Sequence, residues 1–205
     1  MVNYLAVGNI CDDGVGPQLG GGAFLPPDVP WPCDENGREM LHLLSLPGGF
    51  LTNHTNITVD NSMCVSVFIP YSKDSVEESI SLARRKDAAH VLVYEPGNLV
   101  RQQHGWPLQP CRILDVDPDE EAIDDDEFSD EIENKIGGIP VWLQDRIDYA
   151  GMEFCLQLVG GTIKQFWPSH SGIFLGGVGY LFLKPEIPSI RGGSELCGSF
   201  RIQYS

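Results

Sequence analysis

The sequence is poor in basic residues and has no long apolar run. Lys and Arg number 13 against 29 Asp and Glu, which gives the 205-residue chain a formal net charge of −16. A surface with this balance repels phosphate groups, so direct binding to nucleic acid is not expected. No window of about eighteen residues is continuously apolar, which excludes a membrane-spanning helix. No basic segment leading into a long apolar stretch follows Met1, so we expect no secretory signal.

The sequence also lacks the common patterns of metal and redox sites. Its six cysteines include no C-x-x-C pair, and the five histidines do not cluster near them. This argues against a zinc ribbon or a redox pair. Cys64 and Cys155 stand inside apolar runs, where we expect buried and inert thiols. The interpretation is a cytoplasmic protein in a reducing compartment, without a cofactor.

Recognisable catalytic motifs are absent as well. There is no P-loop, dinucleotide fingerprint, nucleophile elbow, H-E-x-x-H pattern or pair of catalytic carboxylates. Asp115, Asp117 and Asp119 are spaced like the start of a calcium loop. However, Glu120 occupies the place of the required glycine, and Asp126 the place of the bidentate glutamate. We therefore predict no metal site and no enzymatic activity.

What the sequence does contain is one dense run of acids. In residues 115–133, twelve of the nineteen residues are Asp or Glu and none is Lys or Arg. The rest of the chain carries 17 acids and 13 bases, a net charge of only −4. The run is either a solvated linker, as blocks of like charge often are, or a surface that attracts a basic partner.

Two segments of the sequence recur in its second half. LGGGAFLPP (19–27) and MLHLLSLPGG (40–49) correspond to IGGIPVWLQ (136–144) and MEFCLQLVGG (152–161). In the longer pair the matching positions alternate, which is typical of a strand that buries one face. A Gly-Gly pair follows each strand, where positive φ or close backbone approach is expected. The pattern indicates an internal duplication. The aligned residues are Met40, His42, Leu44, Leu46, Gly48 and Gly49 with Met152, Phe154, Leu156, Leu158, Gly160 and Gly161.

Short apolar runs predict the remaining strands, and one segment predicts a helix. Lys73–Asp87 has helical spacing, with Ser75 and Glu78 placed as a capping box. The predicted fold class is α+β, with mostly antiparallel strands, an internally duplicated core and few helices. We expect a single domain, 1–205, built from halves of about 1–110 and 135–205 that the acidic segment 115–133 joins. The other predicted strands are Tyr4–Val7, Val65–Tyr71, His90–Tyr94, Gly179–Glu186 and Phe200–Tyr204.

One motif lies in Leu19–Leu46, where Ala23 departs from the pattern, and a second is KIGGIPVWLQD (Lys135–Asp145). The two motifs, in this order, resemble those of the YwqG-like family, also called DUF 1963, and the resemblance covers nearly the whole chain. The resemblance implies a duplicated, mostly antiparallel α+β domain and carries over no catalytic residues. Gly21, Gly22, Trp31 and Pro32 in the first motif, and Gly137 and Gly138 in the second, are interpreted as structural. The first motif also includes Leu25, Pro26, Asp28, Asp34 and Gly37.

Some members of that family look like immunity proteins encoded beside toxins of polymorphic and type VI secretion systems. The resemblance therefore implies a protein that binds a toxin domain, such as a nuclease, and covers its basic active-site surface. We predict that the contacts come from Asp124, Asp125, Asp126, Glu127, Asp130 and Glu131.

Alternatives remain at this point. Trp106 or Trp142 would serve as an anchor for a partner, or would pack in the core. The chain would otherwise be a housekeeping domain that binds a small ligand or metal, or an enzyme of unrecognised type. A third possibility is that the acidic run is a spacer and that loops of the duplicated core make the contacts.

Overall fold

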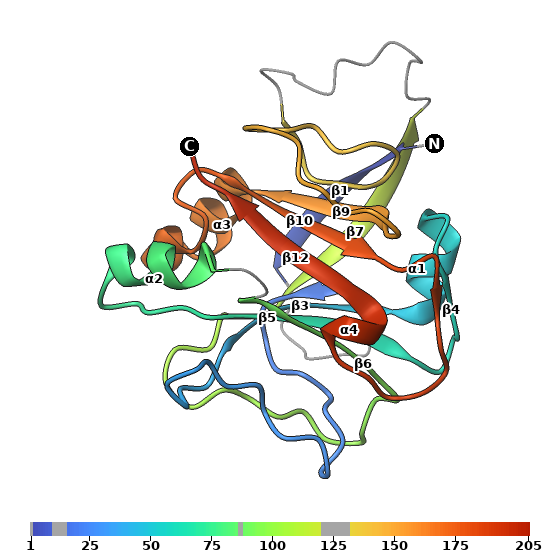
Figure 1. Ribbon diagram of the computed structural model, residues 1–205, viewed down its shortest axis with the longest axis horizontal. Coiled ribbons are helices and arrows are strands. Elements are labelled where there is room, and N and C mark those ends of the chain that lie inside the picture. The colour runs from blue at the N-terminus through green and yellow to red at the C-terminus, as the bar shows by residue number, and fades with distance from the viewer. Residues whose placement is uncertain (1, 10–15, 86–87, 120–131) are drawn as a thin grey trace.

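The computed structural model describes residues 2–9, 16–85, 88–119 and 132–205, and it is built on one ten-stranded sheet. The strand order is β12-β10-β9-β8-β1-β7-β2-β3-β5-β6, and every neighbouring pair is antiparallel. The sheet curls until its edge strands β6 and β12 approach one another (Figure 1). Val93 in β6 forms a bridge with Gly192, a residue shortly before β12. The result is a mostly antiparallel α+β fold with a nearly closed, barrel-like sheet.

The strands are β1 (Val2–Asn9), β2 (Gln18–Leu19), β3 (Leu41–Pro47), β4 (Thr58–Val59), β5 (Cys64–Ile69), β6 (His90–Tyr94), β7 (Cys111–Asp119), β8 (Lys135–Gly137), β9 (Glu153–Val159), β10 (Val178–Leu183), β11 (Glu186–Ile187) and β12 (Gly198–Gln203). The helices are α1 (Gly48–His54), α2 (Val76–Ala83), α3 (Gly160–Phe166) and α4 (Ser194–Cys197), with a 3₁₀ segment at Pro168–Ile173. β4 and β11 form a separate parallel pair.

On both sides of the central pair β1 and β7, the strands follow one another outward in the order of the sequence. On one side of this pair lie β8, β9, β10 and β12, and on the other lie β2, β3, β5 and β6. A short helix follows the second strand of each series, α1 after β3 and α3 after β9. The two central strands are exchanged between the series. β1, which precedes the N-terminal series in the sequence, pairs with β8 of the C-terminal series, and β7, which precedes the C-terminal series, pairs with β2 of the N-terminal series.

Matching β-bulges interrupt the second strand of each series. The register of β3 on β5 shifts between His42 and Leu44, and that of β9 on β10 shifts beside Cys155. An extra residue reverses the faces of all that follow it. The strict alternation predicted for 40–49 is therefore wrong: Leu43 and Leu44 both enter the main core, whereas His42 and Ser45 lie in one hydrogen-bonded cluster away from it.

The core has one large and two small parts. The large cluster takes side chains from strands of both series, including Leu44, Val93 and Leu181. Residues 23–40 bring Trp31 into a second cluster, and residues 142–152 bring Trp142 into a third. The prediction of a strand with one buried face is thus wrong for β3, whose first six residues are all buried. The connecting loops cover the face that was expected to meet solvent.

The predicted helix is present as α2, and three further helices, α1, α3 and α4, were not predicted. Ser75 caps α2 by accepting a hydrogen bond from the Glu78 amide at 3.1 Å, and the helix is shorter than the predicted 73–87. The two Gly-Gly pairs begin α1 and α3 immediately after their strands. A Cβ atom on Gly48 would lie 2.0 Å from the Asp60 carbonyl oxygen, and one on Gly160 would lie 2.8 Å from Gly176 Cα. Close backbone approach therefore requires these glycines, as expected.

Candidate functional site

The acidic run starts within the sheet. Asp115–Asp119 belongs to β7, where Asp115 pairs with Ala6, Asp117 with Tyr4 and Asp119 with Val2. A connection between the predicted halves therefore begins after Asp119 and not at Asp115. The six residues predicted to contact a partner lie outside the described residues: Asp124, Asp125, Asp126, Glu127, Asp130 and Glu131.

The motif glycines form two similar turns, one directly after the short strand β2 and one at the end of the short strand β8. Gly20 and Gly21 have φ values of 64° and 69°, and Gly137 and Gly138 have values of 73° and 71°. This left-handed region strongly favours glycine. Gly22 is required for space, since a Cβ atom there would lie 2.3 Å from a Val100 methyl carbon.

Trp31 and Pro32 fasten the loop that precedes β3. The Trp31 indole is buried and its Nε1–H donates to the Met40 carbonyl at 2.9 Å. The Met40 amide in turn donates to the Pro32 carbonyl at 2.9 Å. Of the two tryptophans considered as anchors, Trp142 is buried in the third cluster, which excludes it. Trp106 is 45 % exposed, with the Lys73 ammonium 4.5 Å from its ring centroid.

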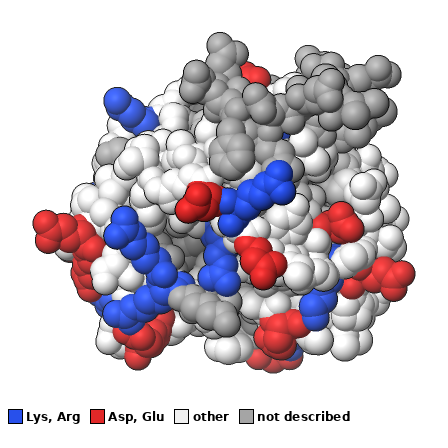
Figure 2. Space-filling view, turned by 45° about the horizontal axis from the view of Figure 1, so that its top comes forward, with Lys and Arg blue, Asp and Glu red and all other residues white. Residues whose placement is uncertain are grey.

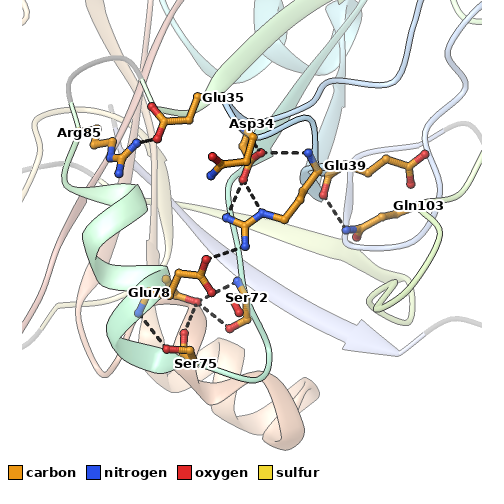
Figure 3. A network of polar contacts seen from close by, with 11 residues as sticks. Asp34, Glu35, Glu39, Ser72, Ser75, Glu78, Arg85 and Gln103 are labelled. Carbon is orange, nitrogen blue, oxygen red and sulfur yellow. Dashed lines mark hydrogen bonds and ion pairs between the residues drawn. The ribbon is translucent and has the colours of Figure 1, made fainter.

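Residues 28–35, here called the strap, lie along the outer face of β6. Ion pairs hold the strap near both ends, Asp28 with Arg191 and Glu35 with Arg85. Figure 3 shows Glu35 directed toward Arg85 near the end of α2, with Asp34 in an adjoining polar network. All four side chains of these two pairs are between 47 % and 69 % exposed, so each pair contributes little stability in water.

Two adjoining hollows lie between the strap and β6, and together we call them the β6 groove. Their volumes are about 330 Å³ and about 500 Å³, and Cys33 and His90 line both. The larger hollow is mainly apolar, with Trp31, Leu92 and Tyr94 in its wall. No sequence motif points to this groove, because its walls come from residues that are far apart in the sequence. The W-P dipeptide was the only local signal near it.

A chain of buried hydrogen bonds runs from Tyr94 to His42. The Tyr94 and Ser66 hydroxyls are 2.6 Å apart, Ser66 and Ser45 are 2.6 Å apart, and Ser45 Oγ lies 2.8 Å from His42 Nε2. His42 Nδ1 lies 3.1 Å from the Gly21 carbonyl, which can only accept, so this nitrogen carries the proton. Every hydroxyl then donates in one direction, from Tyr94 toward His42.

Burial fixes the protonation of these groups. It lowers the pKa of His42 to about 4, so the imidazole is neutral at pH 7. Burial also raises the pKa of the nearby Cys64 thiol to about 11 and raises that of Cys155, which confirms the expectation of inert thiols. His42 stands opposite Phe154 in the predicted repeat, which indicates a core or interface histidine, and it is buried with both ring nitrogens hydrogen-bonded.

The Ser45–His42 contact has the geometry of a nucleophile and its base, but it is closed to substrates. His42, Ser45 and Ser66 are all buried, and none of them lines the β6 groove. The chain instead joins side chains from β3, β5 and β6. Its role in this arrangement is to fix the pairing of these strands, because a fully satisfied buried polar network specifies one packing.

Polar side chains at corresponding places in the C-terminal series make different contacts. Tyr180 Oη donates to the Val141 carbonyl at 2.8 Å and accepts from the Leu143 amide at 3.0 Å. Gln203 Oε1 accepts from the amides of Leu143 and Gln144, each at 3.0 Å. These side chains bind the backbone of the covering loop. In the N-terminal series the serines and Tyr94 bond to one another, and exposed ion pairs hold the strap.

Further observations limit what the site can be. Within the described ranges, no three His, Cys, Asp or Glu side chains come close enough together to hold a metal ion. None of the helices in the described part of the chain has the length and apolarity needed to cross a bilayer. In comparisons with known proteins, the chain matches no family profile, and no curated protein is detectably similar to it.

Proposed function

We propose that this protein is a cytoplasmic immunity protein that binds a basic toxin domain, such as a nuclease of a type VI or polymorphic toxin system. One observation carries the proposal: residues 115–133 supply a charge of −12 out of −16. A nuclease must be basic where it holds phosphates, so a concentrated acidic surface is complementary to its active site. Such a surface speeds encounter and covers the site without any catalysis.

The fold supports this proposal through the position at which the run begins. β7 lies between β1 and β2 in the middle of the sheet, so the first acids are attached to the most central strand. Elsewhere acidic and basic side chains are mixed, and Figure 2 shows both signs interspersed on one face of the molecule. Asp115, Asp117 and Asp119 therefore lie in a central strand, and the other acids of the run follow them in the sequence.

We also infer that the chain arose by internal duplication. The outward strand order, the helix after the second strand and the bulges at Leu43 and Cys155 correspond in the two series. The paired Gly-Gly turns after β2 and β8 correspond as well. Under this inference β7 is the first strand of the second repeat, and the acidic run begins within it.

The proposal is tested with the toxin domain encoded by the neighbouring gene. Asp124, Asp125, Asp126 and Glu127 are changed together to Asn, Asn, Asn and Gln, and the association rate is measured by biolayer interferometry at several salt concentrations. The matched control changes the exposed Glu77, Glu95, Glu153 and Glu186 to Gln, which alters the net charge equally but in scattered places.

We expect the first variant to associate about tenfold more slowly at low salt and to lose most of its salt dependence. The control should retain both the rate and its salt dependence. Equal effects of the two variants would show that only net charge matters. Failure of the unmodified protein to co-purify with the toxin domain or to rescue growth would refute the proposal.

A further inference from the structure

The larger hollow of the β6 groove has an unusual charge composition for so acidic a chain. None of its lining residues is Asp or Glu, although acids outnumber bases 29 to 13 in the sequence. Its ionisable lining residues are Cys33, His90, Tyr94 and Arg191. An anionic group placed in this hollow would therefore meet a cation and no lining carboxylate.

Arg191 retains donors for such a group. Its Nη1 donates to Asp28 Oδ2 at 2.5 Å, and among the described residues this is the one ion pair that it forms. A guanidinium carries five N–H donors, and its planar arrangement matches a carboxylate. The side chain is 47 % exposed, so a ligand reaches it without crossing the core.

The rest of the wall suits a flat apolar body. The Trp31 indole and the Tyr94 ring are buried wall elements, and Leu92 and the two prolines beside Trp31 complete an apolar lining. A volume of about 500 Å³ lies within the range of small-molecule sites.

We propose that this hollow binds a small aromatic carboxylic acid, with its rings between Trp31 and Leu92 and its carboxylate on Arg191. This binding site is separate from the proposed toxin contact. β6 is an edge strand and β7 is central in the sheet, and the strap lies away from the end of β7 (Figure 1). A failure to bind a ligand in the β6 groove would therefore not contradict the proposed toxin contact, and the reverse also holds.

The test compares 2-naphthoate with 2-naphthamide, which share a ring system and differ in charge. Each is titrated into ¹⁵N-labelled protein, and the indole N–H signals of the four tryptophans are followed by NMR. The Trp31 signal reports the groove, and the buried Trp142 and Trp167 serve as internal references. The variant is Arg191→Gln. Its control is Arg146→Gln, at an exposed arginine that lines a different hollow.

We expect 2-naphthoate to shift the Trp31 signal and to bind more tightly than the amide. Arg191→Gln should weaken 2-naphthoate about tenfold and leave 2-naphthamide unchanged, as loss of one charge-assisted contact predicts. Arg146→Gln should change neither. The proposal is overturned if 2-naphthoate does not bind at millimolar concentration or if the two compounds bind with equal affinity. It is also overturned if Arg191→Gln leaves the affinity for 2-naphthoate unchanged, or if 2-naphthoate binds without shifting the Trp31 signal.

Discussion

At the scale of single residues, burial determines what the polar groups do. His42, Ser45, Ser66 and Tyr94 are satisfied by one another, and burial keeps the imidazole neutral. The sequence was sufficient to predict His42 as a core residue, because the aligned position is Phe154. Its partners were not predictable, since they come from three strands and a bulge brings position 42 onto the face of position 45.

The low pKa of His42 predicts a specific loss of stability in acid. The folded-state pKa is about 4 and the usual value is about 6.5, so between these values the unfolded chain binds a proton that the folded chain does not. Stability therefore falls as the pH decreases from about 6.5 to about 4. The expected loss from this one group is about 3 kcal/mol, at 1.36 kcal/mol per pKa unit.

His42→Gln should flatten this pH dependence, although the variant is less stable at pH 7 because the hydrogen bonds change. The free energy of unfolding is measured by urea titration across the pH range. His104→Gln is the control, since His104 is exposed and its Nδ1 lies 2.9 Å from Glu39 Oε1 at the surface. An unaltered slope in His42→Gln would assign the acid sensitivity to other groups.

At the scale of elements, the longer apolar strands were predictable, whereas β2, β4, β7, β8, β11 and the Gly-Gly helices were not. Alternation and apolar runs located β3, β5, β9, β10 and β12 within a few residues, and β6 matches its prediction at both ends. α2 was predicted from its cap and spacing. Nothing local predicts α1 or α3, because glycine disfavours helices and the close approach of Asp60 and Gly176 that requires it is tertiary.

Two glycine substitutions separate tertiary contact from helix propensity. In Gly48→Ala the new methyl group meets the Asp60 carbonyl at 2.0 Å, so the backbone must move. We expect a loss of about 3 kcal/mol, at the upper end of the usual cost of overpacking. Gly161→Ala is the matched substitution in α3, where the nearest atom is 4.0 Å away.

Gly161→Ala should be neutral or more stable by up to about 1 kcal/mol, because alanine favours the helix. Thermal and urea unfolding of both variants provide the measurement. Equal stability of Gly48→Ala and Gly161→Ala would contradict the close approach at Gly48.

At the scale of the whole molecule, the exchange of β1 and β7 is the feature that the sequence did not reveal. The repeat predicted two similar halves, but no local sequence pattern predicts whether the first strand of a half pairs within that half or with the other one. The two halves are consequently not independent units, since β2 rests on β7 and β8 rests on β1.

Separated fragments should therefore fold only together. A cut between His104 and Gly105, both exposed, gives residues 1–104 without β7 and residues 105–205 without β1. We expect neither fragment to show cooperative thermal unfolding by circular dichroism, and the mixture to regain it. Size-exclusion chromatography should then show a one-to-one complex. A cooperatively folded 1–104 fragment would contradict this expectation.

The exchanged strands also set the order in which the fold can form during synthesis. β1 is translated before both of its partner strands, because Val2 pairs with Asp119 and with Gly137, which leave the ribosome much later. Until then, β1 has no partner on either edge, and unpaired strand edges invite pairing with other chains. We therefore expect slow completion of folding, with a nascent chain that depends on chaperones until the middle of the sequence has emerged.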